Sequence, residues 1–288
     1  MRRPGRAVVA LAALCLAGPA PAAPPIWTVH GRQATIILFG AVHVLPPGLD
    51  WRPKALTDAV AGADEVWFEL PIGGDSDTRA IQALRRRGAL RPGETLAARL
   101  KPGQWARLTQ AAAAVGVPPA SLEVMQPWLA EVTLSLAVDA RAGAVAAEGV
   151  ERRIQADAPA TALRKAFETA EQQVGFLAGE TLADQLSSLD LTLGEIADKP
   201  DSYDRTLRAW LDGDLAALAH EDLDPLKAAA PGAYRRLISD RNHRWAGILK
   251  QRLGRSGLVV VVVGVGHLVG PDGVPALLRS QGVIVEGP

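Results

Sequence analysis

The sequence has 288 residues and carries 31 basic and 31 acidic side chains, so its formal net charge at pH 7 is zero. It contains no stripe of lysine or arginine interleaved with aromatic residues, and nucleic acid is therefore not an expected partner. Its length suits either one domain with insertions or two small domains, and composition does not decide between them.

The N-terminus has the pattern of a secretory signal peptide. Basic residues precede an apolar run over residues 7–18, which ends at the small-residue sequence Ala20-Pro21-Ala22. A transmembrane anchor is the alternative, but this run is shorter than the roughly 20 residues that a membrane-spanning helix needs. We expect residues 1–23 to be removed by cleavage near Ala22 or Ala23. The mature protein would then be periplasmic or secreted, without a stable membrane anchor.

The single cysteine, Cys15, lies inside this segment. The bulky Leu14 precedes it, whereas a lipid-modified cysteine follows a small residue, so we do not expect a lipoprotein. The mature chain has no thiol, which excludes disulfides, thiolate catalysis and cysteine-ligated metal. Any metal site must therefore use histidine and carboxylate ligands.

The first part of the mature chain predicts β-structure followed by alternating helix and strand. Two short runs of apolar and β-branched residues, 27–29 and 34–39, predict a hairpin or two paired strands. Residues 52–61 predict a helix. The apolar run 65–69 predicts a second buried strand, which ends before Pro71 and a pair of glycines.

The middle of the chain, from residue 77 to about residue 253, is mainly helical in pattern and rich in alanine and leucine. One exception is the run 162–167, which could be a strand leading to Glu168. Residues 232–253 place apolar side chains on one face of a long helix. We expect this helical part to be an insertion within a single domain that spans residues 24–288.

The C-terminal part returns to α/β structure. The valine-rich run 258–263 predicts a strand that is covered on both faces, and a helix over 272–280 and a last strand over 283–285 follow. The first and last parts of the chain thus share one plan of apolar strand, Gly-x-x-His, turn and helix. We therefore predict an α/β fold, with α+β as the alternative, whose central sheet combines these two halves.

Two histidines and a glutamate form the candidate site. His43 and His267 each lie three residues after a glycine at a strand end, and Glu69 closes a third strand. Ligands of open α/β sheets gather beyond the carboxyl ends of strands. Two imidazoles and one carboxylate are a common ligand set for a catalytic metal that keeps one position open for water. Glu69 could instead be the general base that deprotonates a metal-bound water.

Three further polar residues could belong to this site. Arg241 and Asn242 lie on the predicted long helix, where a guanidinium could bind a substrate carboxylate or an oxyanion. A solvated, salt-bridged helix face is the alternative for this pair. Glu168 could orient a histidine, or it could be the N-cap of a helix that begins at Ala170.

Six short motifs occur in the order and rough spacing of one known family. They are Gly40-Ala-Val-His43, Leu45-Pro-Pro-Gly48, Glu69-Leu-Pro71, Glu168-Thr-Ala-Glu-Gln-Gln173, Asp240-Arg-Asn-His-Arg-Trp245 and Val263-Gly-Val-Gly-His-Leu268. In these motifs the chain resembles the TraB/GumN family, which is related to the Tiki metalloproteases. The resemblance implies an α/β fold with paired Gly-x-x-His motifs and, as in Tiki proteins, a metal-dependent protease activity.

The resemblance also implies site residues. The family pattern falls on His43, Glu69 and His267, with Arg241 and Asn242 as a polar pair and Glu168 as a further acidic position. The sequence departs from the pattern at Glu151, where aspartate is expected, and at Phe167, where leucine is expected. We expect both departures to be peripheral to the site.

Our leading hypothesis is an exported metal-dependent hydrolase, with a peptidase as first choice. His43, His267 and Glu69 would hold one divalent ion, such as Mn, Co or Zn, while Arg241 and Asn242 position a peptide or small-molecule substrate. The alternative is a non-catalytic periplasmic protein that binds a peptide, a haem-like group or another small ligand in the same cleft. A serine hydrolase is not favoured, because no Gly-x-Ser-x-Gly elbow occurs. The oligomeric state stays open.

Overall fold

The computed structural model describes residues 23–288, and a mixed six-stranded sheet forms its centre. The predicted signal peptide lies almost entirely outside these residues. In spatial order, the strands are β4 (Leu163–Ala166), β3 (Glu65–Phe68), β5 (Gly257–Gly264), β2 (Ala34–Ala41), β1 (Ile26–His30) and β6 (Ile284–Glu286). The first four are parallel, whereas β1 is antiparallel to both of its neighbours. The predicted hairpin of β1 and β2 is confirmed.

The two halves of the chain meet in the middle of this sheet. Strands β2 and β5 pair in parallel, with Gly40 opposite Val263 and Ala41 opposite Gly264. Both Gly-x-x-His motifs therefore leave the sheet at the carboxyl ends of neighbouring parallel strands, as predicted. We call this end of the strands the sheet edge. Strand β3 pairs with the other side of β5, so Glu69, the residue after β3, emerges at that edge too.

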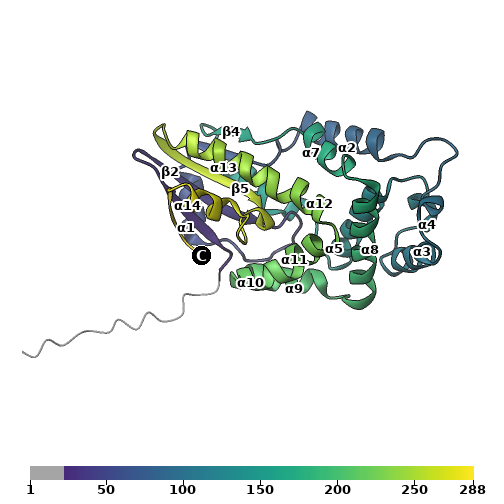
Figure 1. Cartoon of the computed structure of the whole chain (residues 1–288). Coiled ribbons are helices and arrows are strands. Elements are labelled where there is room, and N and C mark those ends of the chain that lie inside the picture. Colours follow the sequence, from purple (N-terminus) through teal and green to yellow (C-terminus); the bar gives the residue numbers. More distant parts are fainter. Residues whose placement is uncertain (1–22) are drawn as a thin grey trace, which may run out of the picture.

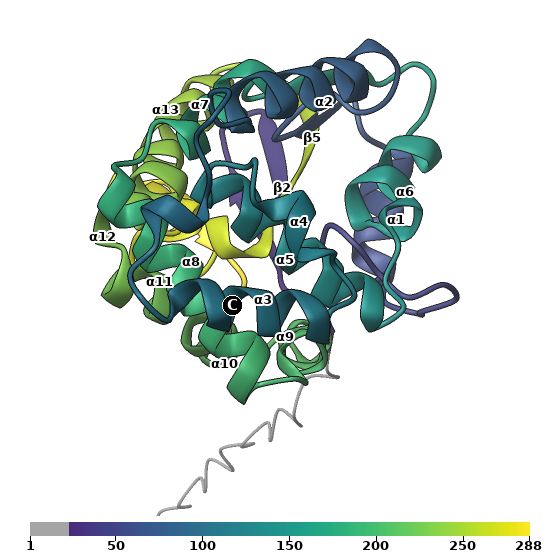
Figure 2. The same cartoon turned by 90° about the vertical axis from the view of Figure 1, so that its right-hand side faces the viewer.

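Helices cover both faces of the sheet. Figure 2 shows α13 (Asp240–Arg252) on one side of β2 and β5, with α1 (Lys54–Ala61) and α6 (Val150–Asp157) on the other. Val260 and Val262 of β5 pack in the cluster that contains α1 and α6, and the alternate valines pack in the cluster that contains α13 and α14 (Val274–Ser280). The prediction of a strand buried on both faces is confirmed.

The helical part of the chain lies beyond one end of the sheet (Figure 1). It has an apolar cluster of its own, which includes Leu108, Leu122, Leu134 and Leu189. The helices between β3 and β5 in the sequence include α2 (Asp75–Gly88), α3 (Gln104–Ala114), α4 (Pro119–Leu122), α5 (Pro127–Arg141), α7 (Ala170–Ala178), α8 (Leu182–Asp198), α9 (Ser202–Asp212), α10 (Leu215–Leu218) and α11 (Asp224–Ala229). The predicted α/β fold with a large helical insertion is confirmed. Strand β4 lies within this part of the sequence and is the outermost strand of the sheet, next to β3.

The long helix predicted over residues 232–253 is present but not uniform. It consists of α12 (Pro231–Tyr234), a π-helical segment (Arg235–Ser239) and α13. Single π-turns within α-helices occur frequently at functional sites. Here the π segment directly precedes Arg241 and Asn242, and the carbonyl of Leu237 within it accepts a hydrogen bond from Arg241 Nη1 at 2.9 Å.

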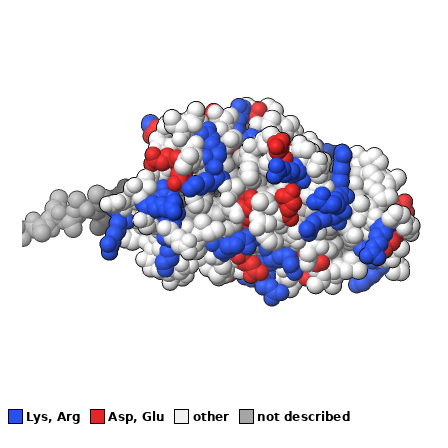
Figure 3. Space-filling view, turned by 90° about the horizontal axis from the view of Figure 1, so that it is seen from above, with Lys and Arg blue, Asp and Glu red and all other residues white. Residues whose placement is uncertain are grey.

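The surface carries charges of both signs. On the face shown in Figure 3, lysine and arginine side chains are interspersed with acidic ones and with uncharged surface. Among residues 23–288, no helix has both the length and the apolar character that crossing a membrane requires.

Candidate functional site

Gly264, the last residue of β5, lies at the centre of the sheet edge. Its N–H donates to Glu69 Oε1 at 2.7 Å. A methyl group on its Cα would lie 3.1 Å from Glu69 Oε1 and 3.2 Å from His43 Nε2. The missing side chain therefore lets a carboxylate and an imidazole approach from both neighbouring strands.

Arg241 connects most of the predicted site residues. Its Nη2 donates to Glu69 Oε2 at 2.6 Å, its Nε donates to Glu168 at 3.0 Å, and its Nη1 lies 2.9 Å from His267 Nε2. Arg241 is only 5% exposed. A buried guanidinium between two carboxylates fixes all three side chains in one geometry. The alternative of a solvated helix face does not describe Arg241.

The hydrogen bonds around His267 assign its tautomer. Asn242 Nδ2 donates to the carbonyl of Asp272 at 2.8 Å, so its amide oxygen faces His267 Nδ1 at 2.6 Å and accepts the Nδ1 proton. His267 Nε2 then accepts from Arg241. Burial, with the nearby Arg241 charge, lowers the pKa of His267 to about 3. His267 is therefore neutral at physiological pH, and both of its nitrogens have partners.

Glu69 is buried and ionised. Burial opposes its ionisation, but the charges of Arg241 and His43 and the Gly264 N–H favour it, and the pKa of Glu69 is lowered to about 2. Both carboxylate oxygens already accept hydrogen bonds. A carboxylate of such low basicity is a poor general base near pH 7.

His43 has a partner that the sequence did not reveal. Its Nδ1 lies 2.5 Å from Glu151 Oε1, and 65% of its side chain is exposed, compared with 14% for Glu151. The Glu151 carboxylate raises the pKa of His43 above its usual range, although solvent screens part of this attraction. The expectation that Glu151 is peripheral is wrong, because it is the only carboxylate in hydrogen-bond contact with His43 within residues 23–288.

The backbone explains how Glu151 reaches His43. Val150 N–H donates to the carbonyl of Val42 at 3.1 Å, which docks the start of α6 against the end of β2. Gly149 lies so close that a Cβ on it would overlap the His43 carbonyl oxygen. The Gly149-Val150-Glu151 sequence thus combines a close backbone contact with a carboxylate in the first turn of a helix.

Glu168 supports the site through Arg241. It accepts hydrogen bonds from Arg241, from Arg244 Nη2 at 2.5 Å and from Trp245 Nε1 at 3.1 Å. The N-cap of α7 is Thr169, whose side chain accepts from Gln172 N–H in a capping box, so Glu168 does not have the capping role. Glu168 also makes no hydrogen bond to a histidine within the described residues.

An aromatic stack lies beneath His267. The ring centroids of Trp245 and His267 lie 4.5 Å apart, and Phe167 stacks on Trp245 with a centroid distance of 4.8 Å. Phe167 was also expected to be peripheral. It instead packs against the residue that supports His267, so a planar aromatic ring at this position is part of the packing around the site.

The predicted metal ligands do not fit a metal ion in this arrangement. Arg241 Nη1 donates a hydrogen bond to the lone pair of His267 Nε2, and Arg241 Nη2 donates one to Glu69 Oε2. The guanidinium therefore fills the position that a metal ion bound to both His267 and Glu69 would need. Among the predicted ligands, only His43 Nε2 and the second lone pair of Glu69 Oε1 have no hydrogen-bond partner within the described residues. Within residues 23–288, no group of three or more His, Cys, Asp and Glu side chains is arranged to hold a metal.

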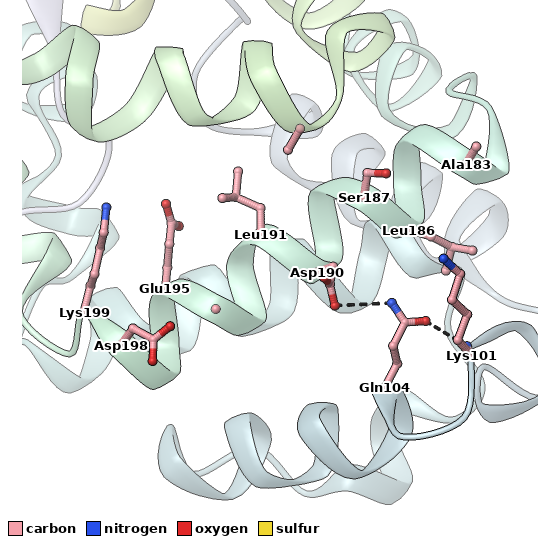
Figure 4. A pocket seen from close by; sticks show the side chains of 12 residues that line it. Lys101, Gln104, Ala183, Leu186, Ser187, Asp190, Leu191, Glu195, Asp198 and Lys199 are labelled. Atoms are coloured by element: carbon pink, nitrogen blue, oxygen red, sulfur yellow. Dashed lines mark hydrogen bonds between the residues drawn. The ribbon is translucent and has the colours of Figure 1, made fainter.

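A pocket of about 350 Å³ opens beside His43 and Glu69. Glu151 and Gln173 also line it, whereas Arg241, Asn242 and His267 do not. A second cavity, of about 700 Å³, lies along α8 between Lys101 and Lys199 (Figure 4). That second cavity has no histidine among its lining residues. The candidate catalytic residues His43 and Glu69 at the sheet edge therefore face the pocket at His43 and not this cavity.

Comparison with known proteins identifies one family. A model of the TraB/PrgY/gumN family matches residues 25–287, which confirms the resemblance that the six motifs indicated. No curated protein and no solved structure matches the chain.

Proposed function

The chain belongs to the TraB/PrgY/gumN family, and we propose that it is an exported hydrolase in which His43, held by Glu151, activates water. One observation carries this proposal. His43 Nδ1 is bound to a carboxylate, while its Nε2 makes no hydrogen bond within the described residues, and both His43 and Glu69 line a pocket. A histidine that a carboxylate orients in this way is the usual arrangement for a general base.

In the proposed reaction, His43 Nε2 accepts a proton from water as the water oxygen bonds to a substrate carbonyl carbon. The imidazolium then returns this proton to the leaving oxygen or nitrogen as the ester or amide bond breaks. Glu151 accepts the Nδ1 proton in a hydrogen bond and stabilises the imidazolium between these two steps. The nearby Glu69 carboxylate also favours the imidazolium by its charge.

Arg241, Asn242, Glu168 and His267 act as positioning residues in this proposal. Arg241 holds Glu69 and His267, Asn242 fixes the tautomer of His267, and Glu168 anchors Arg241. All four are buried and do not line the pocket. Their expected effect is to keep Glu69 ionised and immobile next to His43.

Two parts of the sequence-based hypothesis stay predictions. Export rests on the N-terminal sequence pattern alone. The divalent ion rests on the family resemblance, and no step of the proposed reaction depends on it, because Arg241 occupies the positions that two of its predicted ligands would offer.

The proposal can be tested with libraries of peptides, amides and activated esters. We expect the purified protein to hydrolyse members of these libraries, and His43→Gln to lower kcat by roughly 10²-fold or more, the usual contribution of a positioned base. His243→Gln is the matched control, because His243 is an exposed histidine on α13 whose only hydrogen bond within the described residues is to the backbone carbonyl of Ser239. Equal turnover in the wild type and His43→Gln would contradict the proposal. Ligand binding without any turnover would support the binding-protein alternative.

A further inference from the structure

The pocket beside His43 has mostly apolar walls. Seven of its lining residues are aliphatic or proline: Val44, Leu70, Pro71, Ile72, Ala80, Leu136 and Ala146. They come from the loops after β2 and β3, from α2, from α5 and from the turn before α6. Leu136 is 56% exposed, so much of its apolar side chain is accessible to a ligand in the pocket.

Each charged side chain that lines this pocket has an opposite charge beside it. His43 contacts Glu151 at 2.5 Å, Glu69 contacts Arg241 at 2.6 Å, and Arg152 contacts Asp77 at 2.9 Å. The pocket therefore offers no unpaired charge to attract an ionised substrate group. Apart from these charged groups, only Ser76 and Gln173 among the lining residues have polar side chains.

From these two features we infer that the substrate carries an uncharged apolar group next to its scissile carbonyl. This inference rests on the proposed function. The carbonyl lies at His43 Nε2, and the apolar acyl chain or side chain packs against Leu136 and Ile72. The pocket volume of about 350 Å³ is at the lower end of the range for small-molecule sites, so it holds one acyl group or side chain rather than a long peptide.

A chain-length series tests this inference. The substrates are the 4-nitrophenyl esters of acetate, butyrate and hexanoate, with the hemisuccinate ester as a charged comparison. After subtraction of the rate with His43→Gln, kcat/KM is expected to rise roughly three- to fourfold for each added methylene, as for transfer of a methylene from water. The hemisuccinate is expected to react no faster than the acetate. A flat or falling series would overturn the inference.

A matched pair of variants tests whether the dependence of kcat/KM on acyl-chain length arises at Leu136. Leu136→Asn is expected to lower kcat/KM for the hexanoate at least fivefold and to leave the acetate within twofold of wild type. Leu163→Asn is the control, because Leu163 is similarly exposed, at 60%, but lies on β4 and does not line the pocket. An equal loss for both esters in Leu136→Asn would contradict a specificity role.

A binding measurement separates this inference from the proposed function. If the wild type hydrolyses none of the esters, the proposed function fails, and calorimetric titration with hexanamide and acetamide still tests the pocket. Hexanamide is expected to bind at least tenfold more tightly than acetamide, and Leu136→Asn is expected to remove this difference. Equal affinity of the two amides for the wild type would overturn the inference whether or not the protein is an enzyme.

Discussion

Glu151→Gln is expected to move the acidic limb of the pH–rate profile to lower pH. In the proposed reaction only neutral His43 accepts a proton, so the rate rises as His43 deprotonates. The Glu151 charge holds the pKa of His43 up, and its removal lets that pKa fall. With Nδ1 and Oε1 2.5 Å apart and the screening of bulk water, suited to an exposed ring, Coulomb's law gives about 1.7 kcal/mol. This energy corresponds to a shift of about 1.2 pH units.

The assay is kcat/KM for 4-nitrophenyl hexanoate from pH 5 to pH 10. Because the pKa of His43 is raised to about 10, the wild-type rate is expected to be still rising at pH 10, whereas the rate of Glu151→Gln is expected to level off within this range. Glu148→Gln is the control, because Glu148 lies three residues earlier and pairs with Arg153 instead of His43. If the limb stays at the same pH in Glu151→Gln, the assignment of Glu151 as the partner of the base is refuted.

Two further predictions concern the packing around the site, and a third concerns a buried carboxyl group on α5 in the helical part of the chain. Arg241→Ala is expected to lower the free energy of unfolding by about 3–5 kcal/mol, because it leaves the buried Glu69 without its guanidinium partner and removes one of the two arginines at Glu168. Arg244→Ala, which removes the half-exposed partner of Glu168, is expected to cost roughly 0–1 kcal/mol. Similar losses for the two variants in denaturant titrations would refute this contrast. Gly264→Ala inserts a methyl group between two site side chains and is expected to lower kcat roughly tenfold or more in the ester assay; unchanged kcat would refute a close approach at Gly264. Burial raises the pKa of Glu131 to about 7, so the wild type loses stability as pH rises from about 4.5 to 7. Glu131→Gln should therefore raise the Tm relative to wild type more at pH 8 than at pH 5, and an equal difference at both would contradict this.

The sheet could be predicted from sequence because its strands carry local signals. The valine run of β5 has no polar interruption, which is typical of a strand covered on both faces. The two Gly-x-x-His motifs follow such runs, so their common edge could be predicted from the rule for parallel strands. The insertion of β5 between β2 and β3 had no local signal, because strand order depends on long-range packing.

The environment of each site residue was harder to predict than its identity. Glu151 is 108 residues away from His43 in the chain, and their contact depends on the docking of Gly149 against the His43 backbone. The role of Glu168 depends on the π segment before α13, which helps to position Arg241. Sequence periodicity reports which face of an element is apolar, but it does not report which side chains from distant elements form hydrogen bonds.

The most direct test of the central claim is hydrolysis by metal-free protein. The protein is stripped with a chelator, its metal content is verified by mass spectrometry, and kcat for a library substrate is measured with and without added Mn²⁺, Co²⁺ or Zn²⁺. If His43 and Glu151 activate water, kcat of the stripped protein stays within about twofold of the untreated value, since the base contributes through its own proton transfer. Loss of turnover on stripping and its return with one of these ions would contradict the account and favour the metal-dependent mechanism.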